Sequence, residues 1–570
     1  MKNIFYIAVT LAILTSSCKK QLDYKPQGYL LQQDISGNAA IEGLVTAAYA
    51  AIGNGDMIGP IYSRWAYGGV RSDDCYKGGG GTDDVGDVDA MEHYNLVQAT
   101  MGSFVPRTWK NLFISISRAN AGLRAVNGAT DANFPNKKIR QAELRFLRAH
   151  SYFTMKLLYK NIPIFDENAS DSVILTTSNT VLSNDDSWNK IAADFQFAVD
   201  NLPDQQPKTE IARANKAAAQ AYLAKVRLYQ AYEQDNSNQV VKINLARLQE
   251  VVTLTNAVIN SPNGYHLSAD IGDNFLPETE NGPESIFAIQ FTINDGTTTG
   301  RLNFEDGLNY PHGAPQYGCC GFYAASQNLV NAHTTDANGL PNFDTFNNGI
   351  ADLNTATVDP RLDHTVGIDG HPYKYNPALP FSNNWVRDPG VYGNFHTMRS
   401  QQLATSPSYL KLGPFMGSAK NVDILRLDDI KLMLAEAYIE LGQQDLARPI
   451  INEIRARAAA STGRLKKLDG TFPSHYNVGL YPAAGWTQAY ARKALQWERR
   501  IEFATEGDRF FDLVRWGIAE PVLNAYIAVE KQRRPFLATA KFTAGRDEYL
   551  PIPQSEITFT KGLYKQNPGY

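Results

Sequence analysis

Three segments of the chain share one helical pattern, and this repetition constrains the fold more than any other feature. Each segment contains Ala-x-x-Tyr and then a large apolar residue, among apolar side chains that recur at helical spacing. The small residue lets another helix approach closely, and the aromatic ring one turn later fills the remaining space. The segments are RFLRAHSYFTMKLLY (145–159), KAAAQAYLAKVRLYQAY (216–232) and IKLMLAEAYIELGQ (430–443).

Further amphipathic segments accompany these three. They are SWNKIAADFQFAVDNLP (187–203), INLARLQEVVTLTNAVIN (243–260) and DLARPIINEIRARA (445–458). Helix pairs repeated in this way indicate a tetratricopeptide-like scaffold. Because the spacing between copies is irregular, we predict a mainly α fold with long insertions rather than a regular solenoid.

Two insertions interrupt the helical pattern, at about 53–106 and about 265–420. Both are rich in glycine and aromatic residues, and the second has almost no helical period. Because a structureless loop of that length is unusual in a compact domain, we expect an irregular or partly β subdomain mounted on the helices. Binding chemistry tends to reside in such segments, which a rigid scaffold positions.

The first residues, MKNIFYIAVTLAILTSSCKK, predict export. The apolar run from Ile4 to Leu14 is shorter than the roughly 20 residues that a membrane-spanning helix needs. A basic start, a short apolar centre and small residues before Cys18 are typical of a signal segment, residues 1–17, that is cleaved before a lipid-modified cysteine. The usual pattern has leucine three places before the cysteine, whereas Leu14 is four places before it. An ordinary secretory signal is the alternative.

Charge and cysteine content narrow the function classes. The formal net charge of −4 argues against a nucleic-acid-binding protein, which would need a basic face.

Besides Cys18, the chain has Cys75, Cys319 and Cys320. We expect either a bond from Cys75 to one of the other two or three free thiols. A Cys319–Cys320 bond is disfavoured, because neighbouring Cα atoms lie about 3.8 Å apart and disulfides usually span about 4.4–6.8 Å.

The sequence contains no nucleophile elbow, HExxH, P-loop or dinucleotide fingerprint, so no catalytic residues are predicted. The glycine-rich GGGGTDD near residue 80 lacks the Lys-Ser/Thr of a phosphate loop and is interpreted as a flexible surface turn. The acidic residues Asp83, Asp84, Asp87 and Asp89 could together bind Ca²⁺, but their spacing does not fit an EF-hand and a solvated turn is favoured. No cofactor and no metal site are predicted.

The densest charged stretch is WERRIEFATEGDRFFDLVRWG (497–517). Its acidic and basic residues balance, so we predict an ion-pair lattice that fixes a helix to the core, with Gly507 ending one helix before the next.

This stretch resembles the signature of the SusD/RagB family of outer-membrane lipoproteins. So do LPIPQSEITFTKGLYKQNPGY (550–570), AELRFLRAHSYFTMKLLYKNIPIF (142–165) and RANKAAAQAYLAKVRLYQ (213–230). The short motifs SDD (72–74), SQNLVNA (326–332) and DPRL (359–362) follow in the family's order. The resemblance extends from Cys18 to the last residue.

The resemblance implies about four tetratricopeptide-like helix pairs, with residues 18–264 and 265–570 as the N- and C-terminal regions. It implies a non-enzymatic lipoprotein, anchored in the outer membrane through Cys18 and facing the cell exterior. Such proteins capture oligosaccharides for a SusC-like, TonB-dependent barrel. Two alternatives remain, capture of peptides as in the RagB branch and, less favoured, a surface glycoside hydrolase.

In this family the ligand face comes from the segment after SDD and from the variable insertion. Flat rings would pack against sugar C–H faces, and polar groups would bind the hydroxyls. The candidate ligand residues here are Trp65, Tyr67, Arg71, Asp73, Asp74, Tyr76, Tyr94, Tyr310, Tyr317, Tyr323, Trp385 and Tyr392. Trp109 is excluded as a buried anchor of the first helices.

Overall fold

The computed structural model describes residues 37–53, 57–59, 62–293, 295–296 and 301–570. The predicted signal segment and Cys18 lie outside these residues.

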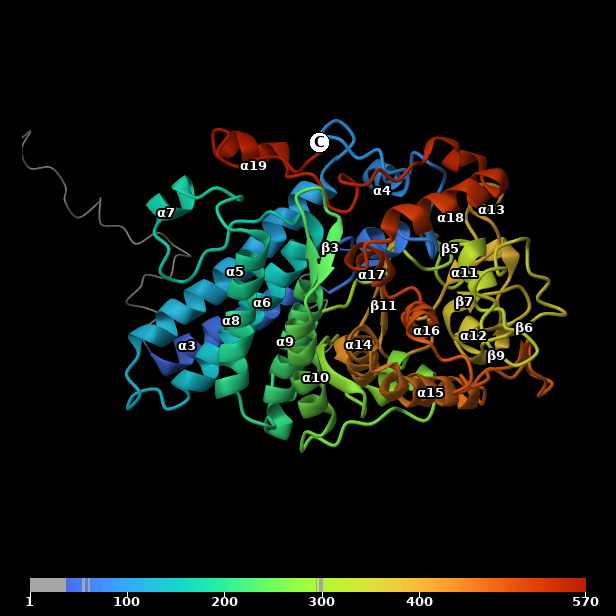
Figure 1. Cartoon of the computed structure of the whole chain (residues 1–570), viewed down its shortest axis with the longest axis horizontal. Coiled ribbons are helices and arrows are strands. Elements are labelled where there is room, and N and C mark those ends of the chain that lie inside the picture. Colours follow the sequence, from blue (N-terminus) through green and yellow to red (C-terminus); the bar gives the residue numbers. More distant parts are fainter. Residues whose placement is uncertain (1–36, 54–56, 60–61, 294, 297–300) are drawn as a thin grey trace, which may run out of the picture.

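The core of the fold is a row of helices, each packed on the next (Figure 1). Helix α5 contacts α6, then α6 contacts α8, α8 contacts α9, α9 contacts α10, α10 contacts α14, and α14 contacts α15 and α16. Helix α3 packs on α5 and α6. The bounds are α3 (Asn38–Ile52), α5 (Phe104–Gly128), α6 (Lys137–Tyr159), α8 (Asn184–Asn201), α9 (Lys216–Ala231), α10 (Leu245–Ile259), α14 (Leu427–Glu440), α15 (Gln444–Ala460) and α16 (Gln488–Glu502). The mainly α scaffold and the six predicted helices are confirmed.

The Ala-x-x-Tyr pattern works as predicted. Ala149 and Ala219 are fully buried between helices. Tyr222 of α9 stacks on Phe195 of α8, with ring centroids 4.7 Å apart and an interplanar angle of 9°. Asn215 caps α9 by accepting a hydrogen bond from the backbone N–H of Ala218 at 2.9 Å. The pattern therefore sets both the packing and the start of the helix.

The remaining elements, apart from α18, are short. The helices are α4 (Gly86–Glu92), α7 (Asp171–Thr176), α11 (Gln327–Ala332), α12 (Arg361–Thr365), α13 (Pro389–Tyr392), α17 (Arg509–Arg515), α18 (Ala519–Arg533) and α19 (Gln554–Phe559), with a π-helical turn, η2 (Trp65–Val70), and 3₁₀ turns η3 (Lys208–Glu210), η4 (Ile271–Phe275), η5 (Pro277–Thr279), η6 (Asn383–Trp385) and η7 (Pro535–Thr539).

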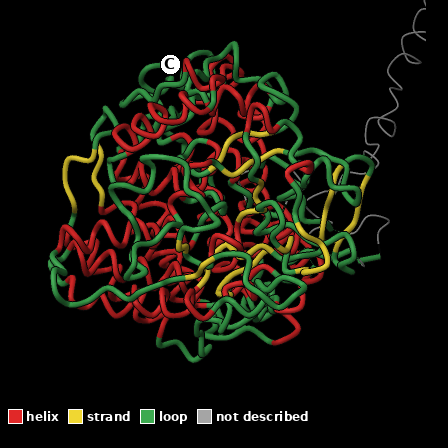
Figure 2. Tube along the Cα trace, turned by 90° about the vertical axis from the view of Figure 1, so that its right-hand side faces the viewer, coloured by secondary structure: helices red, strands yellow, loops and turns green. Residues whose placement is uncertain are grey.

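Strands within the described residues form seven two-stranded sheets, scattered among loops in Figure 2. The pairs are β1 (Cys75–Gly78) with β5 (Phe322–Ala325), β2 (Tyr232–Gln234) with β3 (Val240–Ile243), β4 (Ser285–Ile289) with β13 (Val422–Arg426), β6 (Thr357–Val358) with β14 (His475–Tyr476), β7 (Val366–Gly367) with β10 (His396–Thr397), β8 (Pro372–Tyr373) with β9 (Asn376–Pro380), and β11 (Tyr409–Leu412) with β12 (Phe415–Ser418). Only the β6–β14 pair is parallel. The expected irregular, partly β insertion is confirmed.

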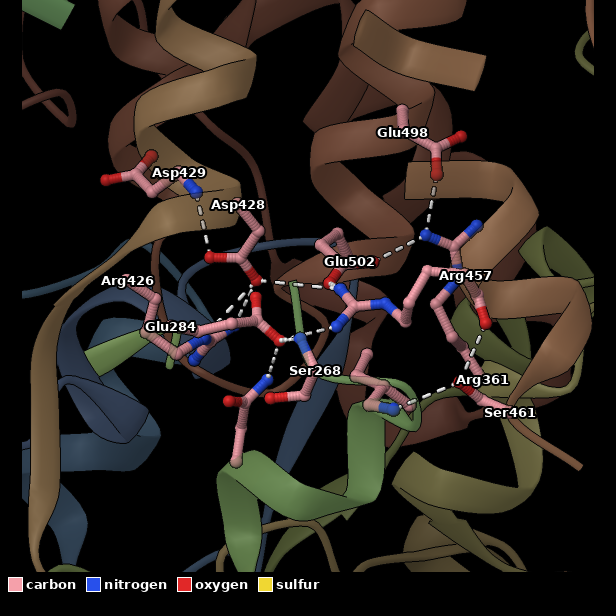
Figure 3. Close-up of polar contacts among 12 residues, drawn as sticks. Ser268, Glu284, Arg361, Arg426, Asp428, Asp429, Arg457, Ser461, Glu498 and Glu502 are labelled. Carbon is pink, nitrogen blue, oxygen red and sulfur yellow. Dashed lines mark hydrogen bonds and ion pairs between the residues drawn. The ribbon is translucent and has the colours of Figure 1, made fainter. Parts of the chain in front are cut away.

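A buried network of ion pairs joins the insertion to the helices (Figure 3). The guanidinium of Arg361 is fully buried and donates to Asp359, to Glu498 at 2.6 Å and to Glu502 at 2.7 Å. Arg457 of α15 pairs with Glu284 and Glu502. Burial favours a raised pKa at Glu502, but Arg457 and Arg361 outweigh burial and lower the pKa to about 2. The ion-pair lattice predicted for 497–517 is confirmed, and Gly507 lies between α16 and α17 at a φ of 83°.

Candidate functional site

The two insertions meet at the β1–β5 sheet, although they lie some 250 residues apart in sequence. The strands are antiparallel, with Cys75 opposite Ala325 and Gly78 opposite Phe322. Beyond the sheet, the N–H of Gly79 donates to the carbonyl of Gly321 at 2.7 Å. This pairing places the segment after SDD beside the variable insertion.

An open groove of about 660 Å³ lies beside this sheet, within the size range of small-ligand sites. Its apolar surface includes three phenylalanine rings, and its polar groups come from α5, from the loop after β1 and from the loop before α13. The lining residues are Met57, Ile58, Asp84, Val85, Phe104, Arg107, Asn111, Leu308, Cys320, Phe322, Arg387 and Phe415. Rings with a few polar groups are the composition that sugar binding requires.

Arg387 joins the two insertions at this groove. Its Nη1 donates to the Asp84 carboxylate at 2.7 Å and to the Cys320 carbonyl at 3.0 Å. The side chain lies against two glycines, because a Cβ atom on Gly80 or on Gly321 would come within 2.7 Å of it. Both glycines are therefore needed to seat this arginine.

The glycine-rich turn near residue 80, which was expected to be a flexible surface turn, wraps around a buried lysine. Lys77 donates through Nζ to the carbonyl oxygens of Gly78, Gly81 and Asp84, at 3.1, 2.8 and 2.6 Å. Burial lowers the pKa of Lys77, against the opposing charges of Glu92 and Asp89. The sequence did not predict a buried role for Lys77, because only the glycine-rich turn beside it has a recognisable pattern.

Three of the four acidic residues after this turn have separate partners. Asp84 pairs with Arg387, and Asp89 lies 3.3 Å from His93. Asp87 accepts a hydrogen bond at 2.9 Å from the N–H of Phe104 and so caps α5. Across the described ranges, no three His, Cys, Asp or Glu side chains are placed to hold a metal ion.

All twelve predicted ligand residues are 9% exposed or less, so the stacking surface expected from their rings is not formed by them. In the first insertion, Trp65 donates to the Met57 carbonyl and packs on Tyr323, and so supports the groove from behind. The hydroxyl of Tyr67 bonds Thr108, that of Tyr76 donates to Glu530, and that of Tyr94 donates to the Arg71 carbonyl. These rings are core residues because their hydroxyls reach internal partners.

The polar candidates are structural as well. Arg71 lies over the Phe510 ring, 4.0 Å from its centroid, and donates to the Asp547 carbonyl. Asp73 pairs with Arg500 and Arg509, and Asp74 pairs with Arg500. The two arginines outweigh the effect of burial and lower the pKa of Asp73 to about 2.

In the second insertion, Tyr310, Tyr317 and Trp385 belong to one satellite core with Tyr373 and Phe381. The hydroxyl of Tyr323 donates to the Thr505 carbonyl, and Tyr392 packs edge-on against Phe536. Trp109 is buried, as predicted. The groove instead uses Phe104, Arg387 and Phe415 from within the two insertions, with Arg107 and Asn111 just after the first one. That location is the only signal the sequence offers for them.

The cysteine prediction was wrong. Cys319 is bonded to Cys320, and Cys75 is buried and free. The register of β1 and β5 explains why Cys75 does not pair. Because Gly78 faces Phe322, Cys320 lies beyond the far end of the strand that Cys75 begins, and that end is already about 10 Å from Cys75 at strand spacing. That separation exceeds a disulfide's span of about 4.4–6.8 Å.

Two family models match this chain. One, described as SusD family, matches residues 283–570, which is half of the chain. The chain belongs to the SusD family. The second, described as "Starch-binding associating with outer membrane", matches residues 78–228 of this SusD-family chain.

Named relatives agree with this membership. A "SusD-like protein P25" of Formosa agariphila is 25% identical over 457 residues, covering 77% of this chain and 76% of that protein. A "SusD-like protein" of Bacteroides ovatus is 24% identical over 297 residues, covering 51% and 50%.

Solved structures share the fold. A SusD superfamily protein from Bacteroides vulgatus has a TM-score of 0.69 at 22% identity, covering 93% of this chain and 99% of that one. A "laminarin binding SusD-like protein" has a TM-score of 0.66 at 22% identity, covering 94% and 100%. Surface glycan-binding protein A from Bacteroides thetaiotaomicron, in complex with laminarihexaose, has a TM-score of 0.63 at 20% identity, covering 93% and 99%.

Proposed function

We propose that this SusD-family chain binds oligosaccharides in the groove between its two insertions and does not hydrolyse them. The observation that carries the proposal is the groove itself, in which two half-buried rings, Phe104 and Phe415, backed by the buried Phe322, accompany the polar groups of Asn111, Arg107 and Arg387. Rings suit the apolar faces of sugars, and amide and guanidinium groups suit their hydroxyls. The family models and the glycan-binding neighbours support the same ligand class.

Calorimetry against a panel of oligosaccharides tests this proposal. Aromatic packing contributes about 0.5–1.5 kcal/mol per ring, so Phe104→Ala or Phe415→Ala should weaken binding by about two- to twelvefold. Phe472→Ala is the matched control, because this ring is 44% exposed and lies outside the groove. Binding of peptides but no glycan would favour the alternative of peptide capture, and release of reducing sugar would favour a hydrolase.

The proposal extends to transport. A SusC-like, TonB-dependent barrel would receive the oligosaccharide, and the chain would be anchored through Cys18 in the outer membrane, facing outward. The family description of association with the outer membrane supports this localisation. In the described part of the chain, no helix combines the length and apolarity needed to cross a bilayer. Metabolic labelling with an alkyne fatty acid, compared between the native chain and Cys18→Ala, tests the anchor.

An apolar hollow supports a partner surface next to the groove. A space of about 1200 Å³ lies between α5, α7 and α19, and Ile174, Leu175 and Phe559 at its rim are 38%, 55% and 70% exposed. Arg107 lines both this hollow and the groove, so a barrel seated here would lie beside the bound sugar. Changing all three rim residues to glutamate should abolish co-purification with the barrel and leave oligosaccharide binding unchanged.

A further inference from the structure

Arg387 has more hydrogen-bonding capacity than its contacts use. Its Nη1 carries two hydrogens, and both are committed, to the Asp84 carboxylate and to the Cys320 carbonyl. Among the residues that the structure describes, Nε and Nη2 donate to no protein acceptor. The side chain is 32% exposed and lines the groove. Three donors, one on Nε and two on Nη2, are therefore available to a ligand, and Nε–H and one Nη2–H lie side by side on one edge of the guanidinium.

This open edge is also held in place. Gly80 and Gly321 seat the side chain from two sides, and the two Nη1 hydrogen bonds fix the plane of the guanidinium. A group that is already oriented loses little conformational entropy on binding. The Nε–Nη2 edge is thus pre-organised rather than a mobile surface charge.

The edge fits one class of acceptor best. Paired N–H groups of arginine match the two oxygens of a carboxylate, or of a sulfate or phosphate, in a bidentate arrangement. A second guanidinium, that of Arg107, lines the same groove and lies 4.5 Å from the centroid of the Phe104 ring. Among the described residues that line the groove, Asp84 is the only acid, and it already accepts from Arg387 and from the N–H of Gly80.

We propose that the groove is selective for acidic oligosaccharides and that the Nε–Nη2 edge of Arg387 binds their carboxylate or sulfate group. This inference rests on the proposed function and names its substrate class. Phe104 and Phe415 would then hold the sugar rings while Arg387 binds the acidic substituent.

The test measures binding of three probes to the protein spanning residues 19–570. An oligogalacturonide hexasaccharide presents carboxylates, a carrageenan hexasaccharide presents sulfates, and laminarihexaose is neutral. We expect at least one acidic probe to bind at least about tenfold more tightly than the neutral one, with an affinity that falls as salt rises. The acidic probe that binds identifies the acidic group.

Variants distinguish binding of the acidic group by Arg387 from a purely structural role of this residue. Arg387→Ala should weaken acidic binding by about tenfold or more. Arg387→Lys, which keeps the charge but loses the fork, should be intermediate. Asp84→Asn, which removes a negative charge beside the arginine, should preserve or strengthen acidic binding. Arg118→Ala is the matched control, because it removes the same charge from the exposed surface of α5 outside the groove.

The outcomes are distinguishable. Preference for laminarihexaose, or equal acidic binding by wild type and Arg387→Ala, overturns the inference and leaves the proposed function intact. Binding of no glycan of any kind overturns both. Equal loss for acidic and neutral probes in Arg387→Ala would show that the arginine only supports the groove, and this also overturns the inference.

Discussion

Glu502 illustrates how much single buried charges contribute to this fold. Its carboxylate accepts from both Arg361 and Arg457, and none of the three side chains is more than 4% exposed. Glu502→Gln would leave two buried guanidinium groups facing a neutral amide. Arg361 keeps Asp359 and Glu498, and Arg457 keeps Glu284, but the buried network would hold one negative charge fewer, so we expect a loss of about 3 kcal/mol in the free energy of unfolding.

Urea unfolding followed by circular dichroism measures this loss. Lys493→Ala is the control, because its pair with Asp344 is exposed, at 41% and 81%, and should contribute at most about 1 kcal/mol. Similar losses in the two variants would show that burial does not govern these pairs.

His396 predicts a dependence of stability on pH. Burial outweighs the hydrogen bond between Nδ1 and the Thr397 carbonyl and lowers its pKa to about 4. In the unfolded chain the histidine takes up its proton near pH 6.5, so the unfolded state binds more protons between pH 6.5 and 4. The stability contribution of neutral His396 is therefore complete above pH 6.5 and is lost as the pH falls toward 4.

Unfolding experiments at several pH values test this. Over that window the wild type should lose about 1.4 kcal/mol per pH unit more than His396→Gln. The exposed His475→Gln provides the control. Parallel curves for wild type and His396→Gln would contradict the prediction.

The state of the three cysteines predicts how many thiols a reagent detects. In the protein spanning residues 19–570, the Cys319–Cys320 bond leaves only Cys75 as a thiol, and Cys75 is 1% exposed. Burial also raises the pKa of its thiol, which lowers its reactivity. We expect a thiol reagent to detect no thiol in the native protein, one after denaturation, and three after denaturation with reduction. Three thiols without reduction would exclude the bond.

Side-chain roles were the part of the site that the sequence predicted least well. Aromatic residues in an insertion can face a ligand or fill an irregular core, and composition does not distinguish these roles. Tyr76 and Tyr94 are buried because Glu530 and the Arg71 carbonyl, both distant in sequence, accept from their hydroxyls. Arg387 was missed for the converse reason, because only the folded chain brings it to Asp84.

At the scale of elements, the contact between η2 and the turn after α16 is close enough to require glycine. A Cβ atom on Gly68 would lie 1.8 Å from the carbonyl oxygen of Gly507. We expect Gly68→Ala to cost about 3 kcal/mol or more, because backbone atoms on both sides would have to move. Urea unfolding gives the measurement.

Gly43 provides the opposite case on α3. A Cβ atom there meets nothing within 4 Å, and the position is inside a helix. Gly43→Ala should stabilise the protein by up to about 1 kcal/mol, since alanine is the better helix former. Equal effects of the two substitutions would contradict the close contact at Gly68.

Helices were predictable and strands were not, for a physical reason. Each helix has its own apolar period, so α6, α9 and α14 could be predicted from 15 or so local residues. The strands are two to five residues long, and several of them, such as β1 and β5, have partners far away in sequence. Short strands have too few residues to show alternation, and their pairing depends on the whole insertion.

At the scale of the whole molecule, charges and apolar faces tie the N-terminal half to the C-terminal half. Asp73 pairs with Arg500 and Arg509, and Lys225 of α9 donates to Asp429 of α14 at 3.0 Å. The apolar faces of α10 and α14 also pack together. The predicted regions 18–264 and 265–570 therefore share one core across the boundary between them.

A fragment spanning residues 37–264 should not fold by itself. It would expose the face of α10 that α14 covers, and it would leave Asp73, Asp74 and Lys225 without the partners that neutralise them in the interior. We expect the fragment to show no cooperative thermal transition, whereas residues 37–570 should unfold in one transition that coincides for near- and far-ultraviolet circular dichroism. Mixing the fragment with residues 265–570 should restore the transition, because the missing partners return. A cooperative transition of the isolated fragment would instead show two independently stable domains.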